Sequence, residues 1–129
     1  SPSAQGAGDA WSCNDGSLVL RLDYGETSVL LAADAEEAAE QAMMDAGLPL
    51  AAKVLKVGHH GSAASTSTAF LAQVAPQVAV ISVGAENRFG HPSPEVLRRL
   101  AGVQVLRTDE HGRIEVISDG QKLSVRRER

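Results

Sequence analysis

Residues that could carry out metal or phosphate chemistry follow three apolar runs of this sequence. These residues are Asp34, His59, His60, Ser62, Arg88 and His91. Carboxylates and neutral imidazoles are common ligands of catalytic metals, whereas guanidinium groups bind phosphate oxygens well. Ligands of open α/β sheets bind beyond the carboxyl ends of the strands. Because each group follows a predicted strand, the sequence predicts that the groups share one edge of a sheet.

Asp34 lies between the apolar run 29–33 and a predicted helix at residues 35–46. An aspartate in this position can act as an N-cap, because its carboxylate accepts hydrogen bonds from the free amides of the first turn. It can also serve as a carboxylate ligand of a metal at the end of a strand. The residue by itself favours the N-cap, so the metal hypothesis depends on its neighbours in space.

His59 and His60 follow the predicted strand 54–57, and Gly61 and Ser62 come directly after them. Two adjacent histidines cannot both point in the same direction, so one could bind a metal while the other faces a substrate. Gly61 would allow a close approach of backbone or ligand, and the Ser62 hydroxyl could bond to a neighbouring group. The alternative is a polar turn in which the histidines cap the next segment.

Arg88 and His91 lie in the loop 87–94, after the apolar strand 78–83. Arg88 could bind a phosphate, and His91 could act as an acid or a hydrogen-bond donor. The alternative is a loop of turn-forming residues that make local hydrogen bonds only. Residues 108–112 also contain two acids and a histidine, but we predict a hairpin turn there, whose tip would hold a metal poorly.

The elements that must position these residues alternate between strands and helices. Strands are predicted at residues 17–23, 27–33, 54–57, 78–83, 104–108, 113–118 and 122–126, and helices at residues 35–46, 66–74 and 94–101. The first two strands form a hairpin around Gly25, and Ser93 caps the last helix, with Pro94 in its first turn. This alternation predicts an α/β layer structure.

The composition of the 129 residues excludes several classes of protein. Apolar residues make up 43% of the chain, which excludes a disordered chain, and no apolar run approaches the roughly 20 residues of a membrane span. The single cysteine, Cys13, excludes an internal disulfide framework and a Cys-rich zinc site. Aromatic residues make up 3%, too few for a platform on which single-stranded nucleic acid could stack. Residues 1–13 are predicted to be a linker, a processed end or an added segment rather than a signal peptide.

Charge is unevenly distributed along the chain. Residues 1–50 carry a charge of −8 and residues 51–129 carry +4, for a net charge of −4. The simple interpretation is that these charges lie on ordinary solvent-exposed surfaces. The alternative is an acidic half that attracts a metal beside a half that tolerates phosphate.

Four blocks of the sequence occur in an order that resembles a known family. The blocks are SLVLRLDYGETSVLLAADAE, AKVLKVGHHGSAAS, VAVISVGAENRFGHPSPEVLRRL and VLRTDEHGRIEV. They resemble the C-terminal half of the metallo-β-lactamase-like domain of ComEC-type competence proteins, which take up DNA in natural transformation. The resemblance covers residues 14–116. It implies an αββα sandwich, of which residues 14–129 would form mainly the C-terminal half, with a mixed sheet and about three helices.

The resemblance also implies an activity and roles for individual residues. The complete domain would be a metal-dependent nuclease or phosphodiesterase that holds divalent Zn or Mn and degrades the DNA strand that is not transported. In that reading Asp34 and His60 bind metal, His59 and His91 act in catalysis, and Ser62 and Arg88 bind substrate. The parent protein would lie in the bacterial inner (cytoplasmic) membrane, with this segment as a soluble domain that makes no lipid contact itself.

The chain also departs from the family pattern. The His-x-(His or Asp)-x-Asp-His motif of the N-terminal half has no counterpart in this sequence, and Ala33 precedes Asp34 where the family usually has glycine. We therefore expect the chain alone to be inactive and to hold no metal by itself. We also expect a homodimer or a swapped pair, because the missing N-terminal half would leave an apolar sheet face uncovered. A catalytically inert DNA-binding or scaffolding module, or a hydrolase of another phosphodiester, remains the alternative.

Overall fold

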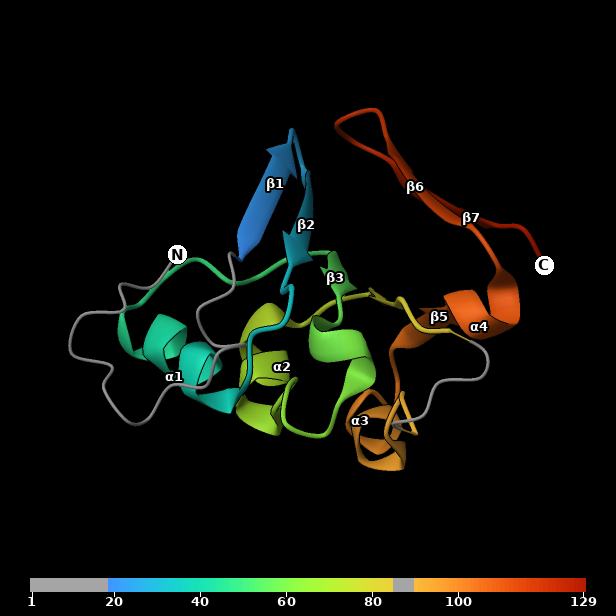
Figure 1. Ribbon diagram of the computed structural model, residues 1–129. Coiled ribbons are helices and arrows are strands. Elements are labelled where there is room, and N and C mark those ends of the chain that lie inside the picture. The colour runs from blue at the N-terminus through green and yellow to red at the C-terminus, as the bar shows by residue number, and fades with distance from the viewer. Residues whose placement is uncertain (1–18, 85–89) are drawn as a thin grey trace.

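The structure is a computed structural model that describes residues 19–84 and 90–129, with His59 described by its backbone only. A five-stranded sheet runs in the order β1-β2-β3-β4-β5, and β6 and β7 form a separate hairpin (Figure 1). The strands are β1 (Leu20–Tyr24), β2 (Thr27–Leu31), β3 (Val54–Lys56), β4 (Val78–Ile81), β5 (Gln104–Arg107), β6 (Ile114–Ser118) and β7 (Leu123–Arg127). The helices are α1 (Glu37–Asp45), the 3-10 helix η3 (Gly58–Gly61), α2 (Thr68–Val74), α3 (Pro94–Arg99) and α4 (Thr108–His111).

The connections between the strands explain why polar loops gather at one sheet edge. β1 and β2 pair antiparallel through a tight turn at Gly25, whereas β2, β3, β4 and β5 pair in parallel. Parallel neighbours need a crossover, and α1, α2 and α3 supply the three crossovers. The carboxyl ends of β2, β3 and β4 therefore lie at the same edge, and the segments that follow them are neighbours.

Local signals in the sequence set the ends of the crossover helices as predicted. The Ser67 hydroxyl accepts a hydrogen bond from Phe70 N at 3.2 Å and caps α2. The Ser93 hydroxyl accepts one from Glu95 N at 3.2 Å and caps α3, with Pro94 in the first turn. Gly47, with φ of +68°, directly follows the last turn of α1. Hydroxyl caps, an N-terminal proline and a C-terminal glycine have these effects in helices generally.

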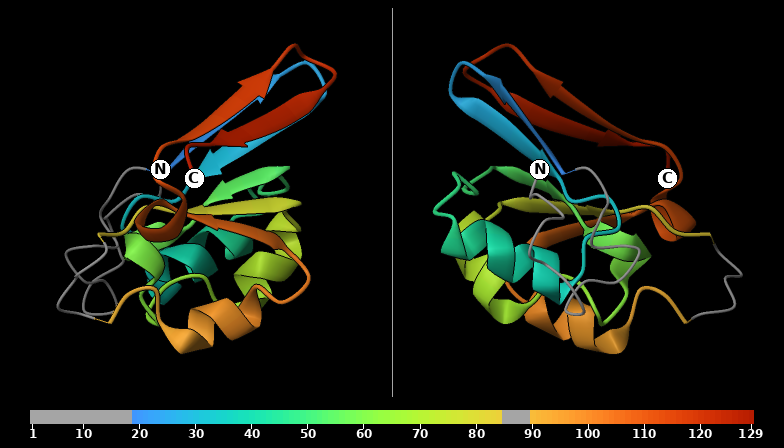
Figure 2. Two further views of the ribbon diagram at one scale, coloured as in Figure 1. Left: turned by 90° about the vertical axis from the view of Figure 1, so that its right-hand side faces the viewer. Right: turned by 60° about the vertical axis from the view of Figure 1, so that its left-hand side comes forward.

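The helices cover one face of the five-stranded sheet, as both views in Figure 2 show. Alternate strand residues such as Leu30, Leu55 and Ile81 point into this layer and are at most 2% exposed. They pack against helix residues, of which Phe70 and Val96 are at most 1% exposed. This packing fixes where each crossover helix begins, and so fixes the loops that precede the helices.

The β6–β7 hairpin covers part of the opposite face. Val54, Val78 and Leu106 form a second buried cluster against apolar side chains of the hairpin. The turns of the two hairpins also touch, since Glu26 N donates to Gly120 O at 2.6 Å, and Figure 2 shows the hairpins side by side. The described residues thus form three layers, which are the helices, the five-stranded sheet and the β6–β7 hairpin.

The predicted α/β class with a mixed sheet is confirmed, but the prediction for residues 108–112 was wrong. A hairpin turn was expected there, whereas β5 and β6 belong to different sheets and the one-turn helix α4 joins them. Contacts with distant residues explain the difference, because the Thr108 side chain bonds to both backbone groups of Val83, at 2.8 and 2.9 Å. The prediction for residues 1–13 falls outside the described residues. Within residues 19–84 and 90–129, no helix is both long and apolar enough to cross a membrane.

Candidate functional site

The histidine loop, η3, lies directly against the turn that carries Asp34. Gly58 begins η3, and a Cβ atom at this position would lie 3.2 Å from Ala35 O and 3.4 Å from Ala33 O. Such distances are tighter than ordinary contacts, so only glycine allows this approach without a shift of the backbone. The structure therefore brings the segments of Asp34 and His60 together, as the sequence predicts.

The other end of η3 contacts the segment that carries His91. Ser93 N donates to Gly61 O at 2.8 Å, and a Cβ atom on Gly61 would lie 2.7 Å from Pro92 Cβ. Gly61 has φ of +84°, which glycine adopts readily. The histidine loop is thus held between the Asp34 turn on one side and the His91 segment on the other.

His60 is exposed, and a hydrogen bond fixes its imidazole. Its Nδ1 lies 2.7 Å from Ser82 O, just beyond the end of β4. A carbonyl oxygen only accepts hydrogen bonds, so Nδ1 carries the hydrogen and Nε2 of the neutral ring keeps its lone pair. Histidine ligands of metals are commonly oriented by this kind of bond from the second ring nitrogen to a carbonyl. Nε2 is therefore the ring nitrogen that His60 would use as a ligand or a base.

Asp34 is half-buried in the turn that follows β2. Glu36, not Asp34, occupies the N-cap position of α1, so the cap interpretation of Asp34 does not hold. Ala33 adopts φ of +51°, a left-handed conformation that glycine would adopt without strain. The glycine usual in the family would suit this position, and Ala33 keeps the same backbone shape at some energetic cost.

The remaining predicted residues are only partly described. The Ser62 hydroxyl accepts a hydrogen bond from Ala64 N at 3.3 Å, which is a local turn contact. His91 is half-buried next to the buried Pro92. Arg88 lies outside the described residues, and so does the side chain of His59.

The described residues do not form a complete metal site. No group of three or more His, Cys, Asp or Glu side chains within residues 19–84 and 90–129 is placed to hold a metal ion. A catalytic zinc site uses three protein ligands. The assignment of Asp34 and His60 as metal ligands therefore stays a prediction, and a complete site would need further ligands.

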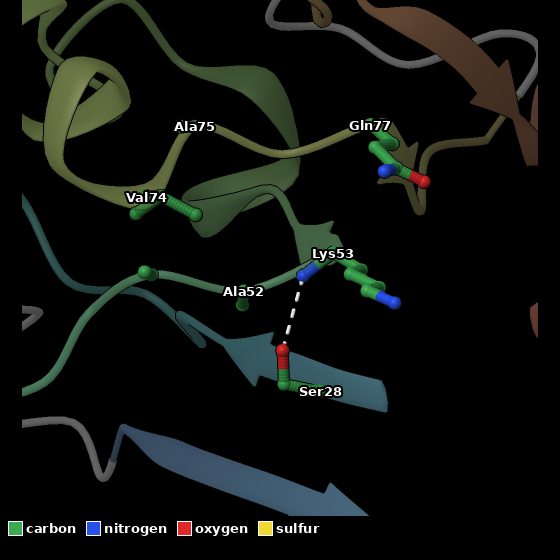
Figure 3. Close-up of a pocket in the computed structure, with 7 residues that line it drawn as sticks. Ser28, Ala52, Lys53, Val74, Ala75 and Gln77 are labelled. Carbon is green, nitrogen blue, oxygen red and sulfur yellow. Dashed lines mark hydrogen bonds between the residues drawn. The ribbon is translucent and has the colours of Figure 1, made fainter. Parts of the chain in front are cut away.

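A cavity of about 230 Å³ lies at the other edge of the sheet (Figure 3). Its lining includes Ser28, Lys53 and Gln77, and the Ser28 hydroxyl accepts a hydrogen bond from Lys53 N at 3.2 Å. Lys53 and Gln77 precede β3 and β4, at their amino ends. This cavity is therefore separate from the site at the carboxyl ends.

Two charged residues that the sequence analysis did not single out bond to the segment that follows the histidine loop. Glu40 is 1% exposed in α1, and Arg99 extends from α3. Both bond to the backbone of the segment between η3 and α2. Glu40 could have been noticed as an acid on the stripe of α1 that also carries the buried Ala39 and Met43.

Comparison with known proteins gives the family. A sequence model described as the metallo-beta-lactamase superfamily matches residues 3–85. The chain is 44% identical to "ComE operon protein 3" of Bacillus subtilis (84% of this chain, 14% of the relative) and 37% identical to "Competence protein ComA" of Neisseria gonorrhoeae (79% and 15%). It is 45% identical to "Recombination protein 2" of Haemophilus influenzae (67% and 11%).

These relatives confirm the resemblance to ComEC-type competence proteins, of which this chain spans between 11% and 15% of the length. No solved structure matches the chain. Because the family match covers more than half of its residues, the chain belongs to the metallo-beta-lactamase superfamily.

Proposed function

We propose that the chain is part of a metal-dependent nuclease or phosphodiesterase domain of a DNA-uptake protein, and that the complete domain degrades the DNA strand that is not transported. One observation carries this proposal. The Asp34 turn, the histidine loop and the His91 segment pack together at the carboxyl ends of β2, β3 and β4, where α/β sheets bind ligands. The similarity to competence proteins favours DNA as the substrate.

Within the complete domain, the residues of this chain would have separate roles in metal binding, proton transfer and substrate binding. Asp34 would supply a carboxylate oxygen and His60 its Nε2 lone pair to a divalent ion, Zn or Mn, whose other ligands come from outside this chain. When bound, such an ion polarises a phosphoryl oxygen and lowers the pKa of a bound water. His59 and His91 would then hold or transfer protons near the scissile phosphate, and Ser62 and Arg88 would bind its oxygens. The parent protein would lie in the bacterial inner membrane.

Positive charge near the same edge supports a phosphodiester substrate. Arg129 N donates to His111 O at 2.9 Å, and α4 is itself bonded to the segment after β4 through Thr108. Arg126, Arg127 and Arg129 are exposed, and no ion pair links them to another described residue. Guanidinium groups in this position could bind a DNA backbone as it approaches the site.

Substitution of the two proposed ligands in the complete parent domain tests this function. Asp34→Ala and His60→Ala should each abolish metal-dependent cleavage of DNA and weaken metal binding measured by calorimetry. Asp45→Ala is the matched control, because Asp45 is an exposed carboxylate at the end of α1. Cleavage that survives both substitutions would sink the proposal.

The second candidate is a catalytically inert DNA-binding or scaffolding module of the uptake machinery. The incomplete ligand set among the described residues favours it. The net charge of −4 speaks against tight DNA binding by this chain alone, since affinity for DNA depends on neutralising phosphates. DNA binding by the complete domain without any cleavage would support this candidate.

A further inference from the structure

Segment 63–67, which joins the histidine loop to α2, donates hydrogen bonds to a buried carboxylate. Glu40 of α1 is 1% exposed, and its two carboxylate oxygens accept hydrogen bonds from Thr66 N at 2.5 Å and Ser67 N at 3.0 Å. A buried carboxylate is unfavourable unless such bonds satisfy it. An apolar residue would pack against the core at this position of α1, so packing alone gives no reason for an acid here.

A guanidinium group also bonds to the same segment. Arg99 of α3 is about a quarter exposed, and its Nη2 also contacts Glu95 at 3.4 Å. Its Nη1 donates to three backbone carbonyl oxygens, those of Ala63 at 3.2 Å, Ser65 at 3.1 Å and Thr66 at 3.4 Å. The Glu40 carboxylate thus accepts hydrogen bonds from backbone amides of the segment, and the Arg99 guanidinium donates to its backbone carbonyl oxygens.

The helices that carry these two groups begin next to the other site residues. α1 begins three residues after Asp34, and α3 begins three residues after His91. Thr66 has φ of +60°, a conformation that non-glycine residues seldom adopt. The segment is therefore held in shape by its contacts rather than by the preference of its own residues.

We propose that Glu40 and Arg99 are positioning residues that hold segment 63–67 and thereby fix the His60 imidazole against Ser82. The catalytic consequence of this inference rests on the proposed function, whereas its consequence for the conformation of His60 does not. The two groups connect α1 and α3 to the segment that directly follows the histidine loop.

Variants of the 129-residue chain test the proposal without any need for activity. Glu40→Gln keeps one acceptor oxygen but replaces the other with an NH₂ group, which cannot accept from Thr66 or Ser67. Arg99→Lys keeps the charge but loses the planar fork. The matched controls are Glu37→Gln and Arg98→Lys, which change exposed residues of the same two helices.

Nitrogen-15 NMR of the His60 ring, at a pH where the ring is neutral, is the first measurement. The wild-type chain should show one tautomer with hydrogen on Nδ1, and both test variants should show a mixture of tautomers. Amide exchange of Thr66 and Ser67 should become at least tenfold faster in Glu40→Gln. The control variants should match the wild type in both measurements.

A wild-type tautomer of His60 in both test variants would overturn the proposal. If circular dichroism shows that Glu40→Gln does not fold, Arg99→Lys decides alone, because Arg99 is only partly buried. In the complete domain both variants should lower kcat while KM stays within about twofold. A complete wild-type domain that cleaves no phosphodiester would refute the proposed function, and the NMR result would still decide on the positioning role.

Discussion

Gly61 determines how closely the histidine loop packs against the His91 segment. Its φ is +84°, and an added Cβ would lie 2.7 Å from Pro92 Cβ. Gly61→Ala should lower the free energy of unfolding by about 2–4 kcal/mol, because left-handed strain and a steric clash add together. Urea denaturation of the chain measures this change.

Gly102→Ala is the matched control for the Gly61 substitution. Gly102 has φ of +88° but no atom within 4 Å of an added Cβ, so only the strain of about 1–2 kcal/mol remains. Equal losses in the two variants would show that the contact with Pro92 does not matter.

Glu40 should give the stability of the chain a characteristic dependence on pH. Burial raises the pKa of Glu40 above its ordinary value of 4.5, against the opposing effect of the hydrogen bonds from Ser67 and Thr66. The folded state therefore binds this proton more tightly than the unfolded state does. The stabilisation from Glu40 is fully present below about pH 4.5 and is lost as the pH rises through the pKa of the folded state.

Substitution of Glu40 isolates this effect. The free energy of unfolding of the wild type minus that of Glu40→Gln should fall in urea titrations as the pH rises above about 4.5. Asp109 provides a control of opposite sign, because its hydrogen bonds with Arg107 lower the pKa of its carboxyl. Stabilisation by Asp109 is present above about pH 3.8 and is lost as the pH falls through its folded pKa. A flat difference for Glu40→Gln would contradict the prediction.

Residue types and their positions after apolar runs identified part of the candidate site. The other residues of the site depend on tertiary contacts, which the sequence does not show. Asp34, His60 and His91 could be assigned to the ends of strands, because apolar runs precede their segments. The N-cap alternative for Asp34 could not be rejected from sequence, since it depends on where α1 begins. Glu40 and Arg99 were missed because their partners are backbone groups of a segment more than 25 residues away in sequence.

At the scale of elements, local signals were sufficient wherever a cap or a turn residue ends an element. Ser93 with Pro94 predicted the start of α3, and Gly25 predicted the turn between β1 and β2. The failure at residues 108–112 has a physical reason. Thr108 bonds to Val83, which is far away in sequence. The sequence of residues 108–112 therefore could not indicate this contact.

The last strand, β7, should contribute to DNA binding by the complete domain. Arg126→Gln combined with Arg127→Gln removes two exposed guanidinium groups. If both bind phosphates, the slope of log affinity for single-stranded DNA against log salt concentration should become shallower by about 1.4, at ~0.7 per phosphate contact. Fluorescence anisotropy at several salt concentrations measures this slope.

A control with the same loss of charge completes the test of β7. Arg98→Gln combined with Lys122→Gln removes two exposed positive charges from α3 and from the tip of the β6–β7 hairpin. This variant should keep the wild-type slope. If the two double variants change the slope equally, the effect comes from net charge and not from β7.

At the scale of the whole molecule, the described residues cover only part of the second face of the sheet. The β6–β7 hairpin packs over Val54, Val78 and Leu106, which local patterns could not predict because the hairpin folds back from a separate sheet. Over β1, the side chains of Leu20, Leu22 and Tyr24 remain 45%, 57% and 61% exposed. They alternate along the strand and so form one apolar row.

This apolar row on β1 should drive self-association of the isolated chain. A second copy of the chain is the partner we expect for this row, because exposed apolar rows on edge strands promote pairing. The chain should sediment as a dimer at concentrations of tens of micromolar. Leu22→Lys should shift it to a monomer without a loss of thermal stability, since Leu22 is already exposed within one chain. Leu48→Lys, at an apolar residue that is 44% exposed and lies outside β1, should leave the dimer intact, and a wild-type chain that sediments as a monomer would contradict the prediction.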